Sequence, residues 1–195
     1  MNRSRKVCFF VAMLLLLVMA LPSLAQQSTN RPADWAQPVV VPGITNCYEV
    51  TTNLYRGAQP SLEGMKQLKA MGIKTVINLR AFHSDDDKVA GTGLNDVRFE
   101  MYPWHGDEDE VVKFLKVTTD TNDLPVFVHC ERGADRTGMM CAMYRIVVCG
   151  WTKQQAIDEM EHGGFRFSPV WENLVTFIRK ADIDEIKHRV GLQSK

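Results

Sequence analysis

The amino-acid sequence predicts an α/β domain with a central mixed or parallel sheet flanked by helices. From residue 53 onward, short apolar runs rich in β-branched residues alternate with segments of helical pattern, which is typical of layered strands and helices. After residue 137 the pattern is mostly helical. A glycine-containing loop joins the last apolar run to the most apolar helix, so we expect a ligand site at the carboxyl end of that strand.

The length and charge of the chain limit the classes of protein it can belong to. Its 195 residues have room for one domain and some additional segments. Basic and acidic residues are equal in number, 23 of each, so the formal net charge is zero. Proteins that bind nucleic acid or membrane surfaces usually have a basic excess, so we expect neither partner for the mature chain.

The first 25 residues have the layout of a secretory signal peptide. Basic residues lie within positions 3–6, an uncharged apolar run of 15 residues follows at 7–21, and small residues occupy positions 23 and 25. The alternative is a membrane anchor, but a spanning helix needs roughly 18–20 apolar residues. We therefore expect cleavage after Ala25 and an exported protein, periplasmic if the source is a Gram-negative bacterium and secreted otherwise.

The rest of the chain is expected to form a leader and one folded domain. Residues 26–45 are rich in Gln, Pro, Ser and Asn without periodicity, which indicates an extended or mobile leader before a domain at 46–195. We expect a short strand and turn at 53–60 and further strands at 73–79, 97–102 and 125–129. We expect helices at 62–71, 111–119, 137–149 and 152–162, a last helix ending near 190, and polar loops at 80–96 and 103–110.

Capping residues support several of these helices. Ser61 and Thr152 are suitable N-caps, Gly72 and Gly150 are suitable stops, and Ser168 with the following proline begins the last helix. The helix at 137–149 is apolar on almost every side, so we expect it to be central and buried.

The loop after the strand at 125–129 has the features of an anion site. Residues 127–138 read FVHCERGADRTG. Backbone N–H groups in such a turn and at a helix N-terminus favour an anion. Gly133 lets the turn close without a Cβ clash, and the Arg136 guanidinium can bind a tetrahedral oxyanion through two hydrogen bonds. The sequence therefore predicts a phosphate site in this loop.

The same surroundings predict that Cys130 is a nucleophile. A helix N-terminus and a nearby arginine favour the thiolate form of a cysteine. A thiolate close to a bound phosphorus atom can attack it and form a phosphocysteine, which water then hydrolyses. We expect the Thr137 hydroxyl to hydrogen-bond the sulfur atom and ease its departure. We expect His129 to hold backbone groups of the loop, because a thiolate needs no general base.

Residues 129–138, HCERGADRTG, match the His-Cys-x5-Arg-Thr-Gly pattern of the cysteine-dependent protein tyrosine phosphatases. With LYRGAQP and GIKTVINLR upstream, the chain resembles the compact dual-specificity branch in its bacterial exported form over roughly residues 50–190. The resemblance implies a mixed sheet flanked by helices, no metal, no cofactor and a two-step phosphocysteine mechanism. By motif match, Cys130 is the nucleophile and Arg136 the phosphate clamp. Backbone N–H groups then come from Glu131, Arg132, Gly133, Ala134 and Asp135.

Such enzymes also use a general acid, typically an aspartate on a mobile loop before the preceding helix. The segment WHGDEDE at 104–110 matches that place. We favour Asp107, which follows Gly106 and lies farthest from the helix start. Asp109 is an alternative, although it can instead be the helix N-cap. Asp135, inside the loop, is a third candidate and can instead hold Arg136 in place.

Three further residues are candidates for the rim of the site. Arg80 ends a strand on the same side of the sheet as Cys130 if the two strands are parallel, although a solvated arginine is the expected reading. Trp104 and His105 lie beside the acidic segment and can flank a substrate ring, or Trp104 can simply pack the loop down.

The five variable residues of the loop carry a formal charge of −1, which disfavours a polyanion. We therefore expect a phosphoprotein substrate, with phosphotyrosine first and phosphoserine or phosphothreonine next, or a small phosphate ester. An inositol-polyphosphate or phytase-like phosphatase is the alternative enzyme. An inactive phosphate-binding module and a rhodanese-type sulfurtransferase are alternatives of other classes.

Four cysteines remain after the expected signal cleavage. Cys141 and Cys149 lie about 12 Å apart along one predicted helix, too far to bridge, and both are expected to be buried. A reactive thiolate is easily oxidised in an oxidising compartment. Cys47 has no evident structural role, so we hypothesise that it pairs reversibly with Cys130.

Overall fold

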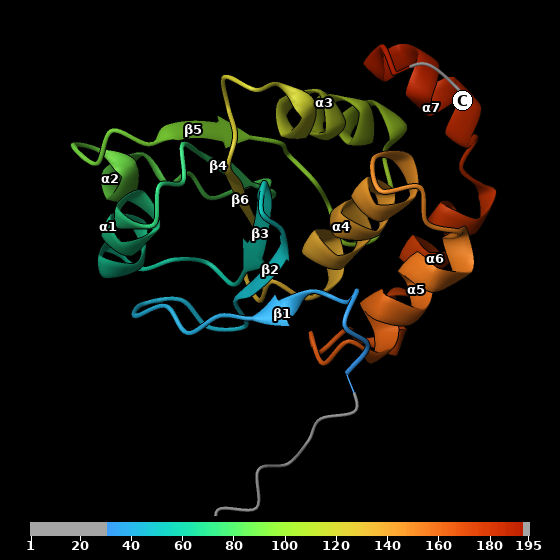
Figure 1. Cartoon of the computed structure of the whole chain (residues 1–195), viewed down its shortest axis with the longest axis horizontal. Coiled ribbons are helices and arrows are strands. Elements are labelled where there is room, and N and C mark those ends of the chain that lie inside the picture. The colour runs from blue at the N-terminus through green and yellow to red at the C-terminus, as the bar shows by residue number, and fades with distance from the viewer. Residues whose placement is uncertain (1–30, 193–195) are drawn as a thin grey trace, which may run out of the picture. The chain divides into compact units, whose positions relative to one another are not determined.

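The computed structural model describes residues 31–192, so the predicted signal peptide lies outside the described residues. Its centre is a six-stranded sheet in the order β1-β2-β3-β6-β4-β5 (Figure 1). The strands are β1 Gln37–Pro38, β2 Tyr48–Thr51, β3 Leu54–Gly57, β4 Thr75–Asn78, β5 Asn95–Arg98 and β6 Val126–His129. β3, β6, β4 and β5 run parallel, whereas β1 and β2 are antiparallel additions. The predicted mixed sheet is confirmed.

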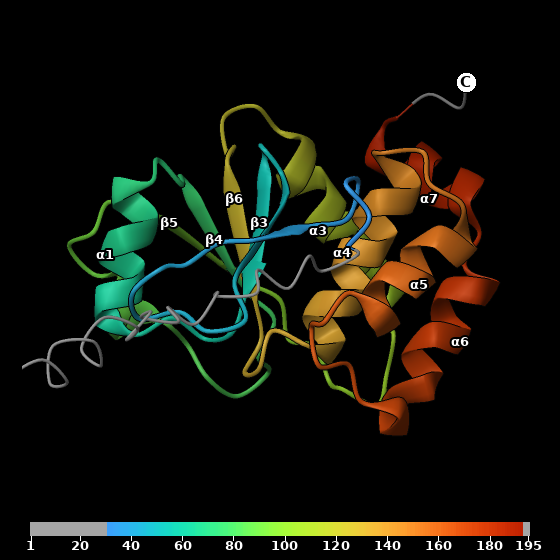
Figure 2. The same ribbon diagram turned by 60° about the horizontal axis from the view of Figure 1, so that its bottom comes forward.

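Helices cover both faces of the sheet. They are α1 Leu62–Ala70, α2 Asp86–Val89, α3 Glu108–Thr119, α4 Asp135–Val147, α5 Lys153–His162, α6 Glu172–Lys180 and α7 Ile183–Val190, with a 3-10 turn at Pro169–Trp171. α1 lies on one side and α3 to α7 on the other (Figure 2), and α2 lies next to α1 (Figure 1). Each side has its own apolar core. Within residues 31–192, every helix is too short or too polar to cross a membrane.

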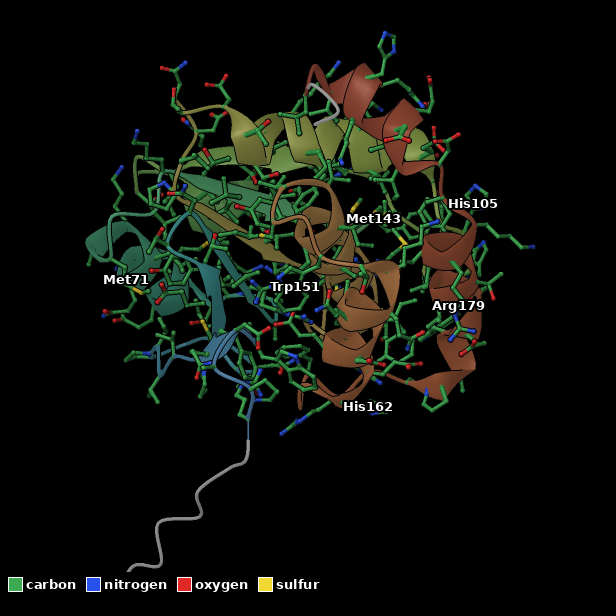
Figure 3. All side chains as sticks on the ribbon, turned by 45° about the vertical axis from the view of Figure 1, so that its right-hand side comes forward. Met71, His105, Met143, Trp151, His162 and Arg179 are labelled. Carbon is green, nitrogen blue, oxygen red and sulfur yellow. The ribbon has the colours of Figure 1, made fainter. Side chains whose placement is uncertain are left out.

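α4 is the central helix of the larger core, as its composition predicts. Eleven of its 13 residues are buried, including Met143, which lies inside the molecule in Figure 3. Arg145 is also buried, and a buried charge is costly unless it is paired. Its Nε and Nη2 atoms donate to the Glu159 carboxylate at 2.9 and 2.8 Å, and its guanidinium lies 4.2 Å from the ring centre of Trp151, labelled in Figure 3.

Several expected elements have different boundaries; α3 begins at Glu108 instead of 111, and α4 spans Asp135–Val147 instead of 137–149. The polar segment 80–96 is not only a loop, because it contains α2 and the start of β5. β5 spans 95–98 instead of 97–102, since it pairs in register with β4 from Thr75–Asn95 to Asn78–Arg98 and ends where β4 ends.

The expected last helix is two helices. Ala181 has extended backbone, and the Asp182 carboxylate accepts hydrogen bonds from the N–H groups of Asp184 and Glu185, so it caps a new helix.

The described part of the expected leader belongs to the folded unit, which begins at Arg31. Gln37 and Pro38 pair with β2. The N–H of Ala36 donates to Glu159 Oε1 at 2.6 Å. Residues 31–45 form only a two-residue strand and bury isolated side chains. Their sequence therefore has no regular repeat of apolar residues.

Candidate active site

The loop at residues 130–136 lies at the carboxyl edge of the parallel strands. It follows β6, which is flanked by β3 and β4, and leads into α4. Cys130 is only 3% exposed but lines a pocket of about 210 Å³. The other lining residues are Pro103, Glu131, Arg132, Asp135, Arg136 and Trp171. The predicted nucleophile and clamp therefore share one pocket.

Gly133 is required by both its conformation and its surroundings. Its φ is +67°, in the left-handed region that favours glycine. A Cβ atom built there would lie 2.3 Å from the carbonyl carbon and oxygen of Gly57 at the end of β3. The loop thus lies directly against the neighbouring strand, which fixes the direction of its peptide groups.

Two polar side chains hold the outer carbonyls of the loop. Arg56, on β3, is 1% exposed, and its Nη2 donates to the Gly133 oxygen at 2.7 Å. Its guanidinium lies 3.8 Å from the ring centre of Phe165. The Nδ2 of Asn46 donates to the oxygens of Arg132 and Phe165, each at 2.9 Å. Since these carbonyls are bound from outside the loop, they are turned away from an anion within it.

The Arg136 side chain is anchored at one nitrogen. Its Nη1 donates to the backbone oxygens of Leu79 at 3.2 Å and Met101 at 3.1 Å, which follow β4 and β5. Its other guanidinium N–H groups make no hydrogen bond within residues 31–192. The arginine is therefore positioned by the sheet edge and keeps donors for an oxyanion.

His129 contacts the loop backbone and a second buried side chain, Asp85, which the sequence did not indicate. Its Nδ1 lies 3.1 Å from the carbonyl oxygen of Cys130. Its Nε2 lies 2.9 Å from Oδ2 of Asp85, an ion-pair contact outside good hydrogen-bond geometry. The two ring nitrogens therefore face two oxygen atoms, one on the loop backbone and one on Asp85.

Asp85 is itself held in a fixed network. Its Oδ1 accepts from Nε2 of Gln59 at 2.5 Å and from Nζ of Lys88 at 3.2 Å. Burial opposes its charge, but the contact with His129 and the bonds from Lys88 and Gln59 outweigh burial and lower the pKa of Asp85 below its ordinary value of 3.8. Asp85 is therefore an anion behind the loop.

Thr137 is fully buried, and its hydroxyl has no hydrogen-bond partner within the described residues. The expected hydrogen bond to the Cys130 sulfur is thus not formed in this arrangement. A buried hydroxyl without a partner is unusual.

The three candidate acids occupy different environments. Asp107, not Asp109, is the N-cap of α3: its Oδ1 accepts from the N–H of Asp109 at 2.8 Å and of Glu110 at 3.4 Å. The Asp109 carboxylate pairs with Arg189 of α7, and its hydrogen bond lowers the pKa of Asp109. Asp135 lines the pocket but does not hold Arg136, because its Oδ1 accepts from the Ser168 N–H at 2.8 Å.

The rim residues separate into two groups. β4 and β6 are parallel, so Arg80 lies on the same side of the sheet as Cys130. Its side chain was expected to be solvated, but it is half-buried and donates to Oε1 of Gln59 at 3.0 Å. Arg80 and Trp104 line a second pocket beside the first. His105 is exposed and lines neither pocket.

The cysteines agree only in part with expectation. Cys141 is buried, but Cys149 lies beyond the end of α4 and is exposed. Cys47 and Cys130 are both free thiols in separate apolar cores, so the structure gives the hypothesised pair no geometric support.

Sequence reasoning missed Asp85, Arg56 and Asn46. Asp85 is the first of three consecutive aspartates, and no pattern distinguishes the buried one from the two exposed ones. Arg56 had a usable signal, because a charged residue inside a short buried strand needs a specific partner.

A thiol and an arginine that enclose an anion-binding loop, beside a helix N-terminus, define a cysteine-dependent phosphatase. A family model described as "DSP-PTPase phosphatase fused to NAD+ Kinase" matches residues 42–173. Dual specificity protein phosphatase TpbA of Pseudomonas aeruginosa is 37% identical over 167 residues, 84% of this chain and 74% of TpbA. Inositol diphosphatase DSP5 of Arabidopsis thaliana is 24% identical over 120 residues, 57% of this chain and 58% of that protein.

Solved structures agree with these relatives. The crystal structure of a Cys-to-Ser variant of P. aeruginosa TpbA in complex with phosphotyrosine has a TM-score of 0.73 and 31% identity, covering 83% of this chain and 98% of that one. The chain therefore belongs to the dual-specificity phosphatase family.

Proposed function

We propose that this protein is an exported phosphatase that hydrolyses phosphotyrosine in proteins, and phosphoserine or phosphothreonine less readily, through a phosphocysteine at Cys130. The observation that carries the proposal is the pocket that contains both Cys130 and the free donors of Arg136. TpbA, the relative solved with phosphotyrosine, supports the substrate class.

In the first step, the Cys130 thiolate attacks phosphorus in line with the tyrosyl oxygen. Arg136 and the loop N–H groups bind the phosphoryl oxygens, whose negative charge they stabilise. The bond from phosphorus to the tyrosyl oxygen breaks, and a general acid donates the proton that this oxygen needs to leave. The product is phosphocysteine and a free tyrosine side chain.

We assign the acid role to Asp107. Asp109 is paired with Arg189 of α7, and Asp135 is held within the loop by a hydrogen bond that its Oδ1 accepts from the Ser168 N–H. Asp107 lies four residues after Pro103, which lines the pocket, so a movement of residues 103–107 that releases the α3 cap brings it to the leaving group.

In the second step, water attacks the phosphocysteine and the Asp107 carboxylate accepts its proton. The phosphorus–sulfur bond breaks, inorganic phosphate is released, and Cys130 leaves as a thiolate. The Thr137 hydroxyl, buried and without a partner among the described residues, is available to donate to that sulfur. His129 and Asp85 hold the Cys130 carbonyl during both steps.

The charge of the pocket favours a phosphoprotein over an inositol polyphosphate. Glu131 and Asp135 balance Arg132 and Arg136 in its lining, so the pocket offers no net attraction to a polyanion. Pro103 and Trp171 add apolar surface suited to a phenyl ring. The relative named as an inositol diphosphatase keeps the second substrate class as an alternative.

Export rests on the sequence pattern of residues 1–25. Expression in a Gram-negative host and N-terminal sequencing of the periplasmic fraction test it. We expect a mature chain beginning at Gln26, and an unprocessed chain in the membrane or cytoplasmic fraction would contradict export.

Phosphate release under reducing conditions tests the activity. A phosphotyrosine peptide and inositol hexakisphosphate are offered in parallel, with Cys130→Ser as the control. We expect release from the peptide that is absent in the variant. Release from the inositol phosphate alone would overturn the substrate class. Release from neither would favour a binding module, and a persulfide on Cys130 after thiosulfate would indicate a sulfurtransferase.

A further inference from the structure

A second pocket of about 180 Å³ lies beside the catalytic pocket. We propose that it is a substrate subsite that binds an apolar or aromatic side chain within two positions of the phosphorylated residue in a protein substrate. This inference rests on the proposed function and extends it from the phosphorylated residue to its neighbours.

The two pockets are continuous. Pro103, Glu131 and Arg136 line both of them. Because Arg136 binds the phosphoryl group in the proposed mechanism, anything in the second pocket lies next to the reacting residue. Neighbouring Cα atoms of a peptide are about 3.8 Å apart, so adjacent side chains of one substrate can occupy both pockets.

The wall of the second pocket is an exposed aromatic cluster of Phe82, Tyr102 and Trp104. The Phe82 and Tyr102 ring centres are 5.6 Å apart in an edge contact, and those of Tyr102 and Trp104 are 5.1 Å apart in a stack. Phe82 is 77% exposed and Trp104 is 63% exposed. Such a patch at the mouth of a site marks a contact surface, and these ring contacts hold it in place.

The size and charge of the pocket select the occupant. A cavity of about 150 Å³ is large enough for benzene, so this one has room for a single apolar side chain. Its charged lining residues are Arg80, Arg136 and Glu131, and the Nη1 atoms of both arginines are already bound, to Gln59 and to backbone oxygens. Apart from His83, the rest of the lining is apolar or aromatic, which suits an apolar side chain: Ala81, Phe82, Met101, Tyr102, Pro103 and Trp104.

Two phosphotyrosine peptides that differ only beside the phosphorylated residue test the inference. One carries phenylalanine and leucine at the flanking positions, and the other carries serine and glycine. We expect kcat/KM to be about tenfold higher for the apolar peptide with the wild-type chain, and close to equal for the two peptides with Phe82→Ala. Phe82 is mostly exposed, so this substitution removes little folding stability.

Hydrolysis of p-nitrophenyl phosphate by Phe82→Ala is expected to match the wild-type rate, because this substrate is too small to reach the second pocket. Val40→Ala, which alters a side chain 98% exposed and outside both pockets, is the matched control and is expected to keep the peptide preference. An equal preference in wild type and Phe82→Ala, while the aryl phosphate is hydrolysed, would overturn the subsite and leave the proposed function intact.

Binding and vesicle measurements separate the remaining outcomes. If no substrate is hydrolysed, the proposed function fails. Fluorescence titration of Cys130→Ser with each peptide then tests the subsite, and tighter binding of the apolar peptide is the expected result. Co-sedimentation of wild type, but not of Phe82→Ala, with phosphatidylglycerol and phosphatidylethanolamine vesicles would assign the aromatic cluster to a membrane surface and overturn the peptide subsite.

Discussion

Oδ2 of Asp85 lies 2.9 Å from Nε2 of His129, and both side chains are fully buried directly behind Cys130. The other ring nitrogen of His129 lies 3.1 Å from the Cys130 carbonyl oxygen. Asp85 lies on the segment after β4, whereas Cys130 follows β6. The pair therefore links two loops at the sheet edge through one imidazole.

Replacing Asp85 with asparagine should weaken both stability and activity. The neutral amide would leave the buried His129 ring without its carboxylate partner, which costs about 3 kcal/mol of unfolding free energy. We expect kcat/KM to fall at least about tenfold, because His129, which contacts the Cys130 carbonyl, loses the carboxylate that fixes its ring. Urea unfolding and steady-state kinetics measure the two effects. Asp86→Asn, an exposed neighbour, is the control, and equal losses in both variants would contradict this role.

The stability difference between wild type and Asp85→Asn should depend on pH. The folded-state pKa of Asp85 is below 3.8, so its contribution is complete above the unfolded value and is lost as pH falls through the folded one. We expect a constant difference above about pH 5 and a shrinking one below 3.8. A difference that stays constant into strong acid would indicate that the Asp85 charge is not involved.

Gly133→Ala should abolish most activity, because its Cβ would lie 2.3 Å from the Gly57 carbonyl. We expect kcat/KM to fall by about 10² or more as the loop is displaced. Gly150→Ala is the matched control, since Gly150 has a similar φ of +75° but open space within 4 Å of the position that a Cβ atom would take. It should lose only about 1–2 kcal/mol from the left-handed backbone and keep full activity. Similar kinetics for both variants would contradict the close packing of the loop.

Substitutions of the three aspartates test the general acid. Asp107→Asn should lower kcat about 10²-fold or more for a phosphotyrosine peptide and much less for an activated aryl phosphate, whose leaving group needs no proton. Its thermal stability should change little, because asparagine is as good an N-cap as aspartate. Asp109→Asn should leave kcat unchanged. A leaving-group-dependent loss in Asp135→Asn, with normal kinetics in Asp107→Asn, would transfer the role to Asp135.

The residues of this site that could be predicted from the sequence lie close to one another along the chain. Cys130, Arg136 and Gly133 lie within seven residues, so strand, turn and helix patterns together indicate their chemistry. The sequence did not predict Asp85 or Arg56, because their partners lie 44 and 77 positions away and come close only through the parallel strand order. It offered Asp109 as a possible N-cap of α3, whereas the cap is Asp107, since several acidic residues in a row can each cap a helix.

Alkylation should distinguish the four cysteines of the described residues. Burial raises the pKa of Cys47 and of Cys141 to about 11, so at pH 8 only about one such thiol in a thousand is ionised. We expect iodoacetamide to modify Cys130 and the exposed Cys149 in the native protein, and inorganic phosphate to protect Cys130 alone. Peptide mass spectrometry measures each site. Rapid native labelling of Cys47 or Cys141 would contradict their burial.

The central claim is that Cys130 becomes phosphorylated during turnover. Rapid acid quenching of the wild-type protein with a phosphotyrosine peptide, followed by peptide mass spectrometry, tests it directly. We expect one phosphoryl group on Cys130, and more of it in Asp107→Asn with an aryl phosphate, since hydrolysis of the intermediate is then slowed. Phosphate release without any adduct on Cys130, or an adduct on another residue, would contradict it.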